Sequence, residues 1–324
     1  GMKRTLTILA IGMALVFALN APVGAKTEFI SIGTGGTGGV YYPYGGGVAE
    51  IWSKSVPDVK AVAEVTGASV ENIKLAHKGE TVVGLVMGDV AAAGVTGEGK
   101  FNGQKHDILT LATMYPNLLQ IVTLKKSGIT DIEQIKGRNV STGSPGSGTN
   151  FMSETAIKAL GIPLDSYSDS RLSFTETANA LRDGTIDVGF WSVGPPTSSI
   201  MDLATTHDIH IISLTPEQIA KVTAANDTYT GVELAGETYN GVDAPVPTIG
   251  VWNVMICQAS LTEDMVYQLA KALFENNDYL FKIHPAAKYT TPENAAKYSP
   301  IPLHPGTIKY LKEIGVEVPA KLIP

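Results

Sequence analysis

The chain has 324 residues, of which 44% are hydrophobic and 17% are charged, so it can bury a large core, and global disorder is excluded. Its formal net charge is −7 at pH 7, which argues against nucleic acid and anionic lipid surfaces as partners. The single cysteine, Cys257, lies in an apolar run; this predicts a small core residue and excludes an internal disulfide.

The chain begins with the pattern of a targeting segment. Lys3 and Arg4 precede an apolar run at residues 6–19, and small residues follow as far as Ala25. This order is typical of a secretory signal peptide cleaved near Ala25. The alternative is an uncleaved anchor, but the run is shorter than a spanning helix needs. We therefore expect a periplasmic protein with no direct membrane insertion. Without residues 1–25, 22 basic residues remain against 31 acidic ones, a net charge of −9.

Short apolar runs alternate with helical patterns in the first part of the chain. We expect strands at 29–32, 59–65, 81–87, 108–114 and 118–124, a helix from the glycine-rich turn to about residue 56, and a helix capped by Ser69 and ended by Gly79. The last two strands are separated by Tyr115-Pro116-Asn117. Such alternation predicts βαβ units in a largely parallel sheet.

The same alternation continues through the rest of the chain. We expect helices at 130–136, 150–160, from a capping box at 173–176 to 182, from Pro195-Pro196, from 215, at 261–283 and at 308–314, and strands at 139–142, 186–191, 210–214 and 248–257. Residues 226–247 lack periodicity and are expected to form a long loop.

The order of these elements predicts two α/β lobes with a cleft between them. The apolar runs at 118–124 and 248–257 bracket a self-contained βα block. If both runs cross between lobes, the first lobe is discontinuous, with residues 26–120 plus 253–324, and the second lobe holds residues 121–252. Two crossing strands suit hinge closure around a ligand.

The most prominent motif is the glycine-rich segment at residues 33–42, G-T-G-G-T-G-G-V-Y-Y. Glycines let the backbone approach a ligand closely, and the N–H groups at a helix start attract anions. Thr34 and Thr37 add hydroxyls, and Tyr41 adds an apolar wall with a polar tip. Gly33, Gly35 and Gly38 also fit the dinucleotide pattern G-x-G-x-x-G. That match is weak in a glycine-rich loop of an exported protein, so no cofactor is expected.

A second segment of this kind, Ser144-Pro145-Gly146-Ser147-Gly148-Thr149-Asn150, lies between a predicted strand and a predicted helix. It again offers small residues, hydroxyls and amides at a helix start. Two anion-attracting helix starts, one in each lobe, favour a ligand held at the carboxyl ends of the strands. No Gly-x-Ser-x-Gly elbow is present, so the sequence does not support a hydrolase.

Four further residues are candidates for the cleft. Ser69 and Asn72 lie on the first turn of a predicted helix. Ser69 either contacts the ligand or only caps this helix. Trp191 and Tyr115 lie at strand ends, and each either covers the ligand or belongs to the core. The six histidines lack zinc-ligand spacing, so we expect neither a metal site nor catalytic residues.

These residues together resemble a known family. The segments G-T-G-G-T-G-G-V-Y-Y (33–42), T-G-A-S-V-E-N (66–72), S-P-G-S-G-T (144–149), L-R-D-G-T-I-D (181–187), A-L-F-E (272–275) and P-L-H-P-G (302–306) are similar to the TAXI family of TRAP-transporter solute receptors. The resemblance implies a type II periplasmic-binding-protein fold, with two Rossmann-like lobes joined by hinge strands. It also implies partnership with TRAP permease membrane subunits driven by a sodium gradient.

The resemblance implies a receptor, not an enzyme, that binds a small carboxylate such as glutamate, glutamine or 2-oxoglutarate. With the motifs above it gives an expected ligand site of Thr34, Thr37, Gly38, Val40, Tyr41, Ser69, Asn72, Tyr115, Ser144, Gly146, Ser147, Thr149, Trp191 and Gly194. Related receptors clamp the carboxylate with an arginine, and Arg171 is the one candidate for that role here. The alternatives are an exported sensor for a signalling partner and a secreted α/β hydrolase.

Overall fold

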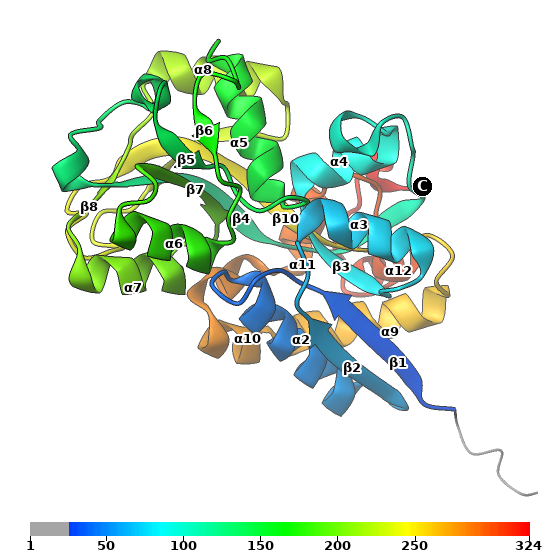
Figure 1. Ribbon diagram of the computed structural model, residues 1–324. Helices are drawn as coiled ribbons and strands as arrows, with labels where there is room; N and C mark the ends of the chain where they lie inside the picture. The colour runs from blue at the N-terminus through cyan, green and yellow to red at the C-terminus, as the bar shows by residue number, and fades with distance from the viewer. Residues whose placement is uncertain (1–25) are drawn as a thin grey trace, which may run out of the picture.

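The computed structural model describes residues 26–324 (Figure 1). The predicted signal peptide lies outside the described residues. The amino-terminal elements are β1 (Glu28–Gly33), α2 (Tyr41–Ser55), β2 (Val59–Glu64), α3 (Ser69–Lys78), β3 (Val83–Met87), α4 (Gly88–Thr96) and β4 (Ile108–Leu124). Across residues 26–324, none of the helices has the length and apolar character that crossing a membrane requires.

The middle and the end of the chain continue the alternation of strands and helices. The middle elements are β5 (Asn139–Ser141), α5 (Gly148–Ala159), β6 (Ser168–Asp169), α6 (Phe174–Asp183), β7 (Val188–Val193), α7 (Ser198–Thr206), β8 (Ile209–Ile211), α8 (Pro216–Ala225) and β9 (Thr230–Leu234). The last elements are β10 (Val246–Gln258), α9 (Glu263–Glu275), α10 (Asn277–Ile283), α11 (Pro292–Tyr298) and α12 (Pro305–Glu313).

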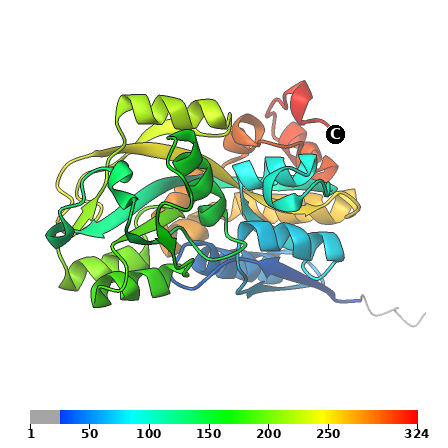
Figure 2. The ribbon, with the colours of Figure 1, turned by 45° about the horizontal axis from the view of Figure 1, so that its top comes forward.

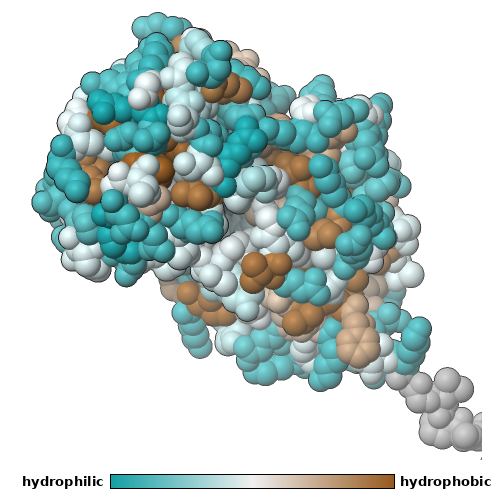
Figure 3. All heavy atoms as spheres, in the orientation of Figure 1, coloured by the Kyte–Doolittle hydropathy of each residue, from teal (hydrophilic) through white to brown (hydrophobic). Residues whose placement is uncertain are grey.

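One sheet runs through the molecule in the strand order β2-β1-β3-β10-β4-β7-β5-β6. The strands β1 to β3 with α2 to α4 and α9 to α12 form what we call the first lobe, and β5 to β9 with α5 to α8 form the second lobe. The long strands β4 and β10 run from one lobe into the other (Figures 1 and 2). On the surface drawn in Figure 3, a hollow lies between the two lobes. The predicted α/β fold with two lobes is confirmed; the exact domain boundaries stay a prediction.

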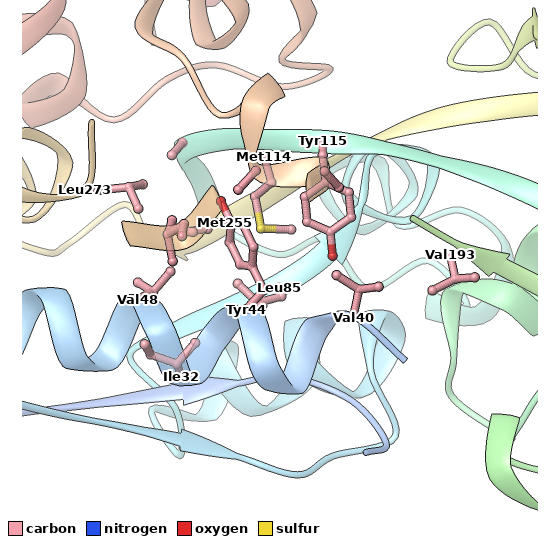
Figure 4. Close-up of a cluster of buried hydrophobic side chains, with 14 of the residues drawn as sticks. Ile32, Val40, Tyr44, Val48, Leu85, Met114, Tyr115, Val193, Met255 and Leu273 are labelled. Atoms are coloured by element: carbon pink, nitrogen blue, oxygen red, sulfur yellow. The ribbon is translucent and has the colours of Figure 1, made fainter. Parts of the chain in front are cut away.

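Two hydrophobic cores lie on opposite faces of the sheet, and each extends through both lobes. One core contains Val48 of α2, Leu269 of α9 and Ile200 of α7, and Figure 4 shows its centre around Tyr44 and Met114. The other core collects the apolar sides of α3, α4, α5 and α8. Cys257 is fully buried in β10, as predicted.

Two expectations were wrong: the division of residues 108–124 into two strands, and the long loop without a strand at 226–247. β4 is one continuous strand through Pro116, although proline cannot donate a ladder hydrogen bond. Pro116 is opposite Trp252, where the β4–β10 register shifts, and an irregularity of this kind is where a sheet tolerates proline. Residues 226–247 contain β9, which pairs antiparallel with β10. Its alternation of apolar and polar residues is weak, so its strand conformation depends on this pairing with a long neighbouring strand.

Three helix expectations also needed correction. The predicted helix at 261–283 divides at Asn276, whose φ of −118° is not helical and whose side chain donates to the carbonyl of Ala272. Pro195 and Pro196 precede α7, which begins at Ser198 after the N-cap Thr197. The helix expected at 150–160 begins earlier, at Gly148. The helices α4 and α11 were not predicted, because their short apolar stretches do not show a full helical period.

Candidate functional site

A pocket lies between the two lobes and receives side chains from both. Its cavity volume is about 60 Å3. The lining residues are Gly35, Gly36, Gly39, Val40, Tyr41, Gly67, Ala68, Ser69 and Met87 from the first lobe, Ser144, Ser147, Gly148, Thr149, Ser173, Phe174, Ser192 and Val193 from the second, and Asn117 from β4. The pocket therefore suits a small solute.

The amino-terminal end of α5 forms one wall of this pocket. Ser147 is the N-cap, and its Oγ accepts a hydrogen bond from the backbone N–H of Asn150 at 3.0 Å. The N–H groups of Gly148 and Thr149 precede the first intrahelical hydrogen bond and so have no partner within the helix. The N–H of Ser192 donates to Thr149 Oγ1 at 3.2 Å. The Ser147 and Thr149 hydroxyls thus shape the helix start, and the amides of Gly148 and Thr149 are left for a ligand.

The amino-terminal end of α2 forms the opposite wall. This helix follows the glycine-rich turn directly, and its N-cap Val40 makes no side-chain capping hydrogen bond. Pro43, near the start of the helix, has no N–H that would need a partner. Val40 and Tyr41 both line the pocket. Two helix starts, one from each lobe, therefore meet the same small volume.

The amino-terminal end of α3 has a different role from the one expected. The N–H groups of Val70 and Glu71 donate to the carbonyl of Gly146 in the second lobe, at 3.0 and 3.3 Å. Ser69 does not cap this helix, since Ala68 is the N-cap. Instead Ser69 Oγ accepts from the N–H of Met87 at 3.1 Å. In this closed arrangement, α3 holds the other lobe directly.

A chain of buried hydrogen bonds lies behind the pocket and connects both lobes to the long strands. Tyr41 OH donates to Asn253 Oδ1 at 2.6 Å, Asn253 Nδ2 donates to Asn117 Oδ1 at 2.7 Å, and Asn117 Nδ2 donates to the carbonyl of Ser192 at 2.9 Å. Asn253 lies where the β4–β10 register shifts, and bulges of this kind re-aim side chains at functional sites. Burial raises the pKa of the Tyr41 hydroxyl, so it remains a donor.

Among the pocket residues that the structure describes, Ser192 on β7 is the one with a fully buried side-chain polar atom that lacks a partner. It is 3% exposed, and within residues 26–324 its Oγ makes no hydrogen bond. A buried hydroxyl without a partner costs about 1–3 kcal/mol, and a polar ligand in the pocket would remove that cost. Sequence reasoning did not single out Ser192, Asn117 or Asn253 as site residues; the signal for each was a polar residue inside an apolar strand.

Six of the fourteen predicted site residues line the pocket: Val40, Tyr41, Ser69, Ser144, Ser147 and Thr149. The other eight lie outside its lining. Thr37 is exposed, Thr34 Oγ1 donates to the carbonyl of Glu64 at 2.6 Å, and the Asn72 amide donates to the carbonyls of Gly33, Thr34 and Leu85. Thr34 and Asn72 thus hold the first lobe together, which is why their polar groups are turned away from the cleft.

The aromatic candidates belong to the core. Tyr115 is fully buried and packs edge-on against Tyr44 with ring centroids 5.2 Å apart; Figure 4 shows it between Met114 and Val40. Trp191 is fully buried, and its Nε1 donates to Ser199 Oγ at 3.1 Å. Both face the core because consecutive residues of a strand point to opposite faces.

The three remaining glycines make contacts between or within the lobes. The carbonyl of Gly38 accepts from the Thr197 and Ser198 hydroxyls. The carbonyl of Gly146 accepts from α3, and Gly194 lies against the Tyr115 ring. Gly38 and Gly146 thus join the lobes around the pocket, and neither lines it.

No charged side chain lines this pocket among the residues that the structure describes. Arg171, the candidate clamp, instead approaches Glu154 at 3.6 Å and Asp169 at 3.5 Å. Glu154 also accepts from Lys100 of the first lobe at 2.8 Å, so this ion-pair cluster joins the two lobes. Residues 26–324 contain no cluster of three or more His, Cys, Asp or Glu side chains placed to hold a metal ion. Any anion in the pocket must be held by amides and hydroxyls.

A second contact between the lobes involves a buried carboxyl. Asp89, at the start of α4, accepts hydrogen bonds from Tyr229 OH of the second lobe at 2.6 Å and from the N–H of Val90 at 2.9 Å. Burial raises the pKa of the Asp89 carboxyl to about 6, and both hydrogen bonds act in the opposite direction. The folded protein therefore binds a proton at Asp89 more readily than the unfolded chain.

Replacing Asp89 by asparagine is expected to remove a pH dependence of stability. The raised pKa contributes stability that is full below the ordinary value of 3.8 and is lost as the pH rises through about 6. Relative to Asp89→Asn, the free energy of unfolding of the wild type should fall by about 2 kcal/mol between pH 4 and pH 7. Urea unfolding of both proteins at these two pH values measures this change in the free energy of unfolding. Tyr229→Phe should steepen the fall, and parallel curves for wild type and Asp89→Asn would contradict the assignment.

The comparisons with known proteins agree with this architecture. The NMT1-like family model matches residues 32–315. A solved structure of a protein from Bordetella bronchiseptica RB50 is 17% identical, with 91% of this chain and 85% of that chain covered and a TM-score of 0.53. The putative L-cystine ABC transporter from Listeria monocytogenes matches at 14% identity, with 84% and 98% covered and a TM-score of 0.49.

An alkanesulfonate-binding protein, SsuA from Xanthomonas axonopodis pv. citri bound to MOPS, matches at 12% identity, with 90% of this chain and 92% of that chain covered and a TM-score of 0.47. Likeness at such low identity concerns the fold alone. The predicted α/β fold in two lobes agrees with the sheet order of the structure.

Proposed function

The chain belongs to the NMT1-like family, and on that premise we propose that it is an extracytoplasmic solute receptor of a TRAP transporter of the TAXI type. It binds a small carboxylate such as glutamate, glutamine or 2-oxoglutarate and performs no chemistry on it. The observation that carries the proposal is the meeting of the α2 and α5 helix starts at one small pocket between two lobes. Helix starts of this kind attract anions.

The geometry supports a binding cycle in which the lobes close on the solute. In the open receptor, the carboxylate docks on the amides of Gly148 and Thr149 at the start of α5. The second lobe, residues 121–252, then swings onto the first lobe about β4 and β10. Gly146 reaches α3 and Gly38 reaches Thr197, as in the closed arrangement described above. The closed form is what the permease recognises in the periplasm.

A thermal-shift screen of amino acids, 2-oxo acids and dicarboxylates tests the binding proposal. An acid present at 100 times its dissociation constant stabilises the folded state by about 2.7 kcal/mol, which is a readily measured rise in the unfolding midpoint. Isothermal titration calorimetry of the best acid then gives the stoichiometry, which should be one per chain. A panel in which no carboxylate raises the midpoint would refute a carboxylate receptor.

The transporter type needs a separate test. Membrane vesicles from the native cells should take up the labelled acid when the purified receptor is added and a sodium gradient is imposed. Uptake that needs ATP instead would contradict the TRAP assignment and leave the binding proposal intact. A signalling partner in place of a permease would show as binding without receptor-dependent uptake.

A further inference from the structure

The first residues of α6 in the second lobe pack against the glycine-rich turn of the first lobe. A Cβ at Gly39 would lie 3.0 Å from both Cδ2 and Cε2 of the Phe174 ring. A Cβ at Gly38 would overlap Thr175 Oγ1 and lie 3.1 Å from the Thr175 backbone N. Neither glycine has a φ in the left-handed region, so the turn itself would accept a side chain at both positions. Glycine is needed there because α6 approaches so closely.

Contacts within the second lobe hold the Phe174 ring in place. The ring stacks on Trp191, with centroids 6.0 Å apart and an angle of 20° between the ring planes. Trp191 is fully buried and its Nε1 donates to Ser199 Oγ at 3.1 Å. Gly189 leaves room for the Trp191 ring, since a Cβ at Gly189 would lie 2.6 Å from Trp191 Cζ3. The Phe174 ring therefore belongs to the rigid packing of the second lobe.

The contact between Phe174 and Gly39 lies at the pocket. Both residues line it, and the Phe174 side chain is half-buried. The two residues come from different lobes, so the contact exists only when the lobes are closed. Phe174 thus supplies an apolar wall that reaches the backbone of the first lobe only in the closed arrangement.

We propose that Phe174 seals the closed pocket and limits the length of the solute that the receptor accepts. This inference rests on the proposed function and names the residue that selects among the acids of its solute class. The cavity volume is about 60 Å3, and close-packed walls leave little room for a longer chain. A solute that is too long presses against the ring and holds Phe174 away from Gly39, whereas a shorter solute leaves this contact intact.

Phe174→Ala tests the length limit with two pairs of acids that differ by one methylene. Glutamate is compared with 2-aminoadipate, and 2-oxoglutarate with 2-oxoadipate. A methylene that an apolar wall accepts or rejects changes binding by roughly tenfold or more. In calorimetry, the dissociation constant of the longer acid divided by that of the shorter acid should therefore fall by about tenfold in the variant, for each pair that binds.

The seal itself is tested by the dissociation rate of the shorter acid, measured by stopped flow. The rate should rise in Phe174→Ala, because changes at a binding interface act mainly on dissociation. Phe281→Ala on α10 is the matched control, since Phe281 is 51% exposed and does not line the pocket. It should leave both the ratio and the rate unchanged. Phe174→Leu keeps a shorter apolar side chain, and its ratio should lie between those of the wild type and Phe174→Ala.

A double-mutant cycle with Gly39→Ala tests the contact between the lobes. In the wild-type background Gly39→Ala should weaken binding of the shorter acid by about tenfold, because the new Cβ meets the Phe174 ring when the lobes close. In the Phe174→Ala background the same substitution should have little effect, since the ring is absent. Urea unfolding without ligand shows that each variant is folded.

The outcomes separate this inference from the proposed function. An unchanged ratio or dissociation rate in Phe174→Ala would overturn the inference while a carboxylate receptor still stands. Equal effects of Gly39→Ala in the two backgrounds, or a change of the same size in Phe281→Ala, would also overturn it. Binding of none of the four acids to the wild type would overturn both proposals.

Discussion

Gly148→Ala is expected to weaken binding of the solute by about tenfold to a hundredfold without unfolding the protein. A Cβ at Gly148 would lie 2.6 Å from Ser69 Oγ and 2.5 Å from Met87 Sδ, and both of these residues belong to the first lobe. The overlap exists only when the lobes are closed. Overpacking of this kind costs about 1–3 kcal/mol, and every 1.4 kcal/mol is about tenfold in affinity. Calorimetry measures the affinity and small-angle scattering measures closure.

Gly46→Ala on α2 is the matched control for this variant. A Cβ there meets nothing within 4 Å, so the same substitution should leave the affinity unchanged and add about 1 kcal/mol of helix stability. If Gly148→Ala bound as tightly as the wild type, the closed arrangement of the lobes would not be the binding form.

Ser192→Ala is expected to change affinity and stability in opposite directions. The ligand-free protein should gain stability, since the substitution removes a buried hydroxyl without a partner, which costs about 1–3 kcal/mol. Binding should weaken by about tenfold or more, because a hydrogen bond to a charged group contributes about 1.5–3 kcal/mol. Urea unfolding without ligand and calorimetry with ligand measure the two effects on the same preparation.

Ser153→Ala on α5 separates the ligand contact from the general effect of removing a hydroxyl. Ser153 is also fully buried, and its Oγ also lacks a partner within residues 26–324, but it does not line the pocket. It should gain stability in the same way and keep full affinity. Equal losses of affinity in both serine variants would remove Ser192 from the site.

The sequence predicted those parts of the fold that depend on local signals. The capping box at Ser173 and Glu176 opens α6 as expected, and Gly79 ends α3 in the left-handed conformation. β9 was missed because its strand character comes from pairing with β10. The break at Asn276 interrupts an apolar stripe that by itself predicts one long helix. Strand pairing formed β9, and the Asn276 side chain marks the end of α9. Neither feature produces a periodic pattern of apolar residues in the sequence.

The helix starts that line the pocket were predicted from the sequence, but the buried hydrogen bonds behind the pocket were not. Two glycine-and-hydroxyl motifs indicated which helix starts line the pocket, because the residues of each motif are close together in the sequence. Asn117 and Asn253 come together only through the register of β4 and β10, and no pattern along the chain fixes that register. Conversely, Asn72 and Trp191 were expected in the site, but their polar groups bond elsewhere. The Asn72 amide donates to the carbonyl of Leu85 in the first lobe, and Trp191 Nε1 donates to Ser199 Oγ on α7.

The most direct test is a crystal structure of the chain with the acid that raises its unfolding midpoint most. We predict that one carboxylate oxygen lies within hydrogen-bond distance of the Gly148 or Thr149 amide, with Ser192 Oγ bonded to the same molecule. An acid bound outside the pocket between the lobes, or bound inside it but away from the start of α5, would contradict the account.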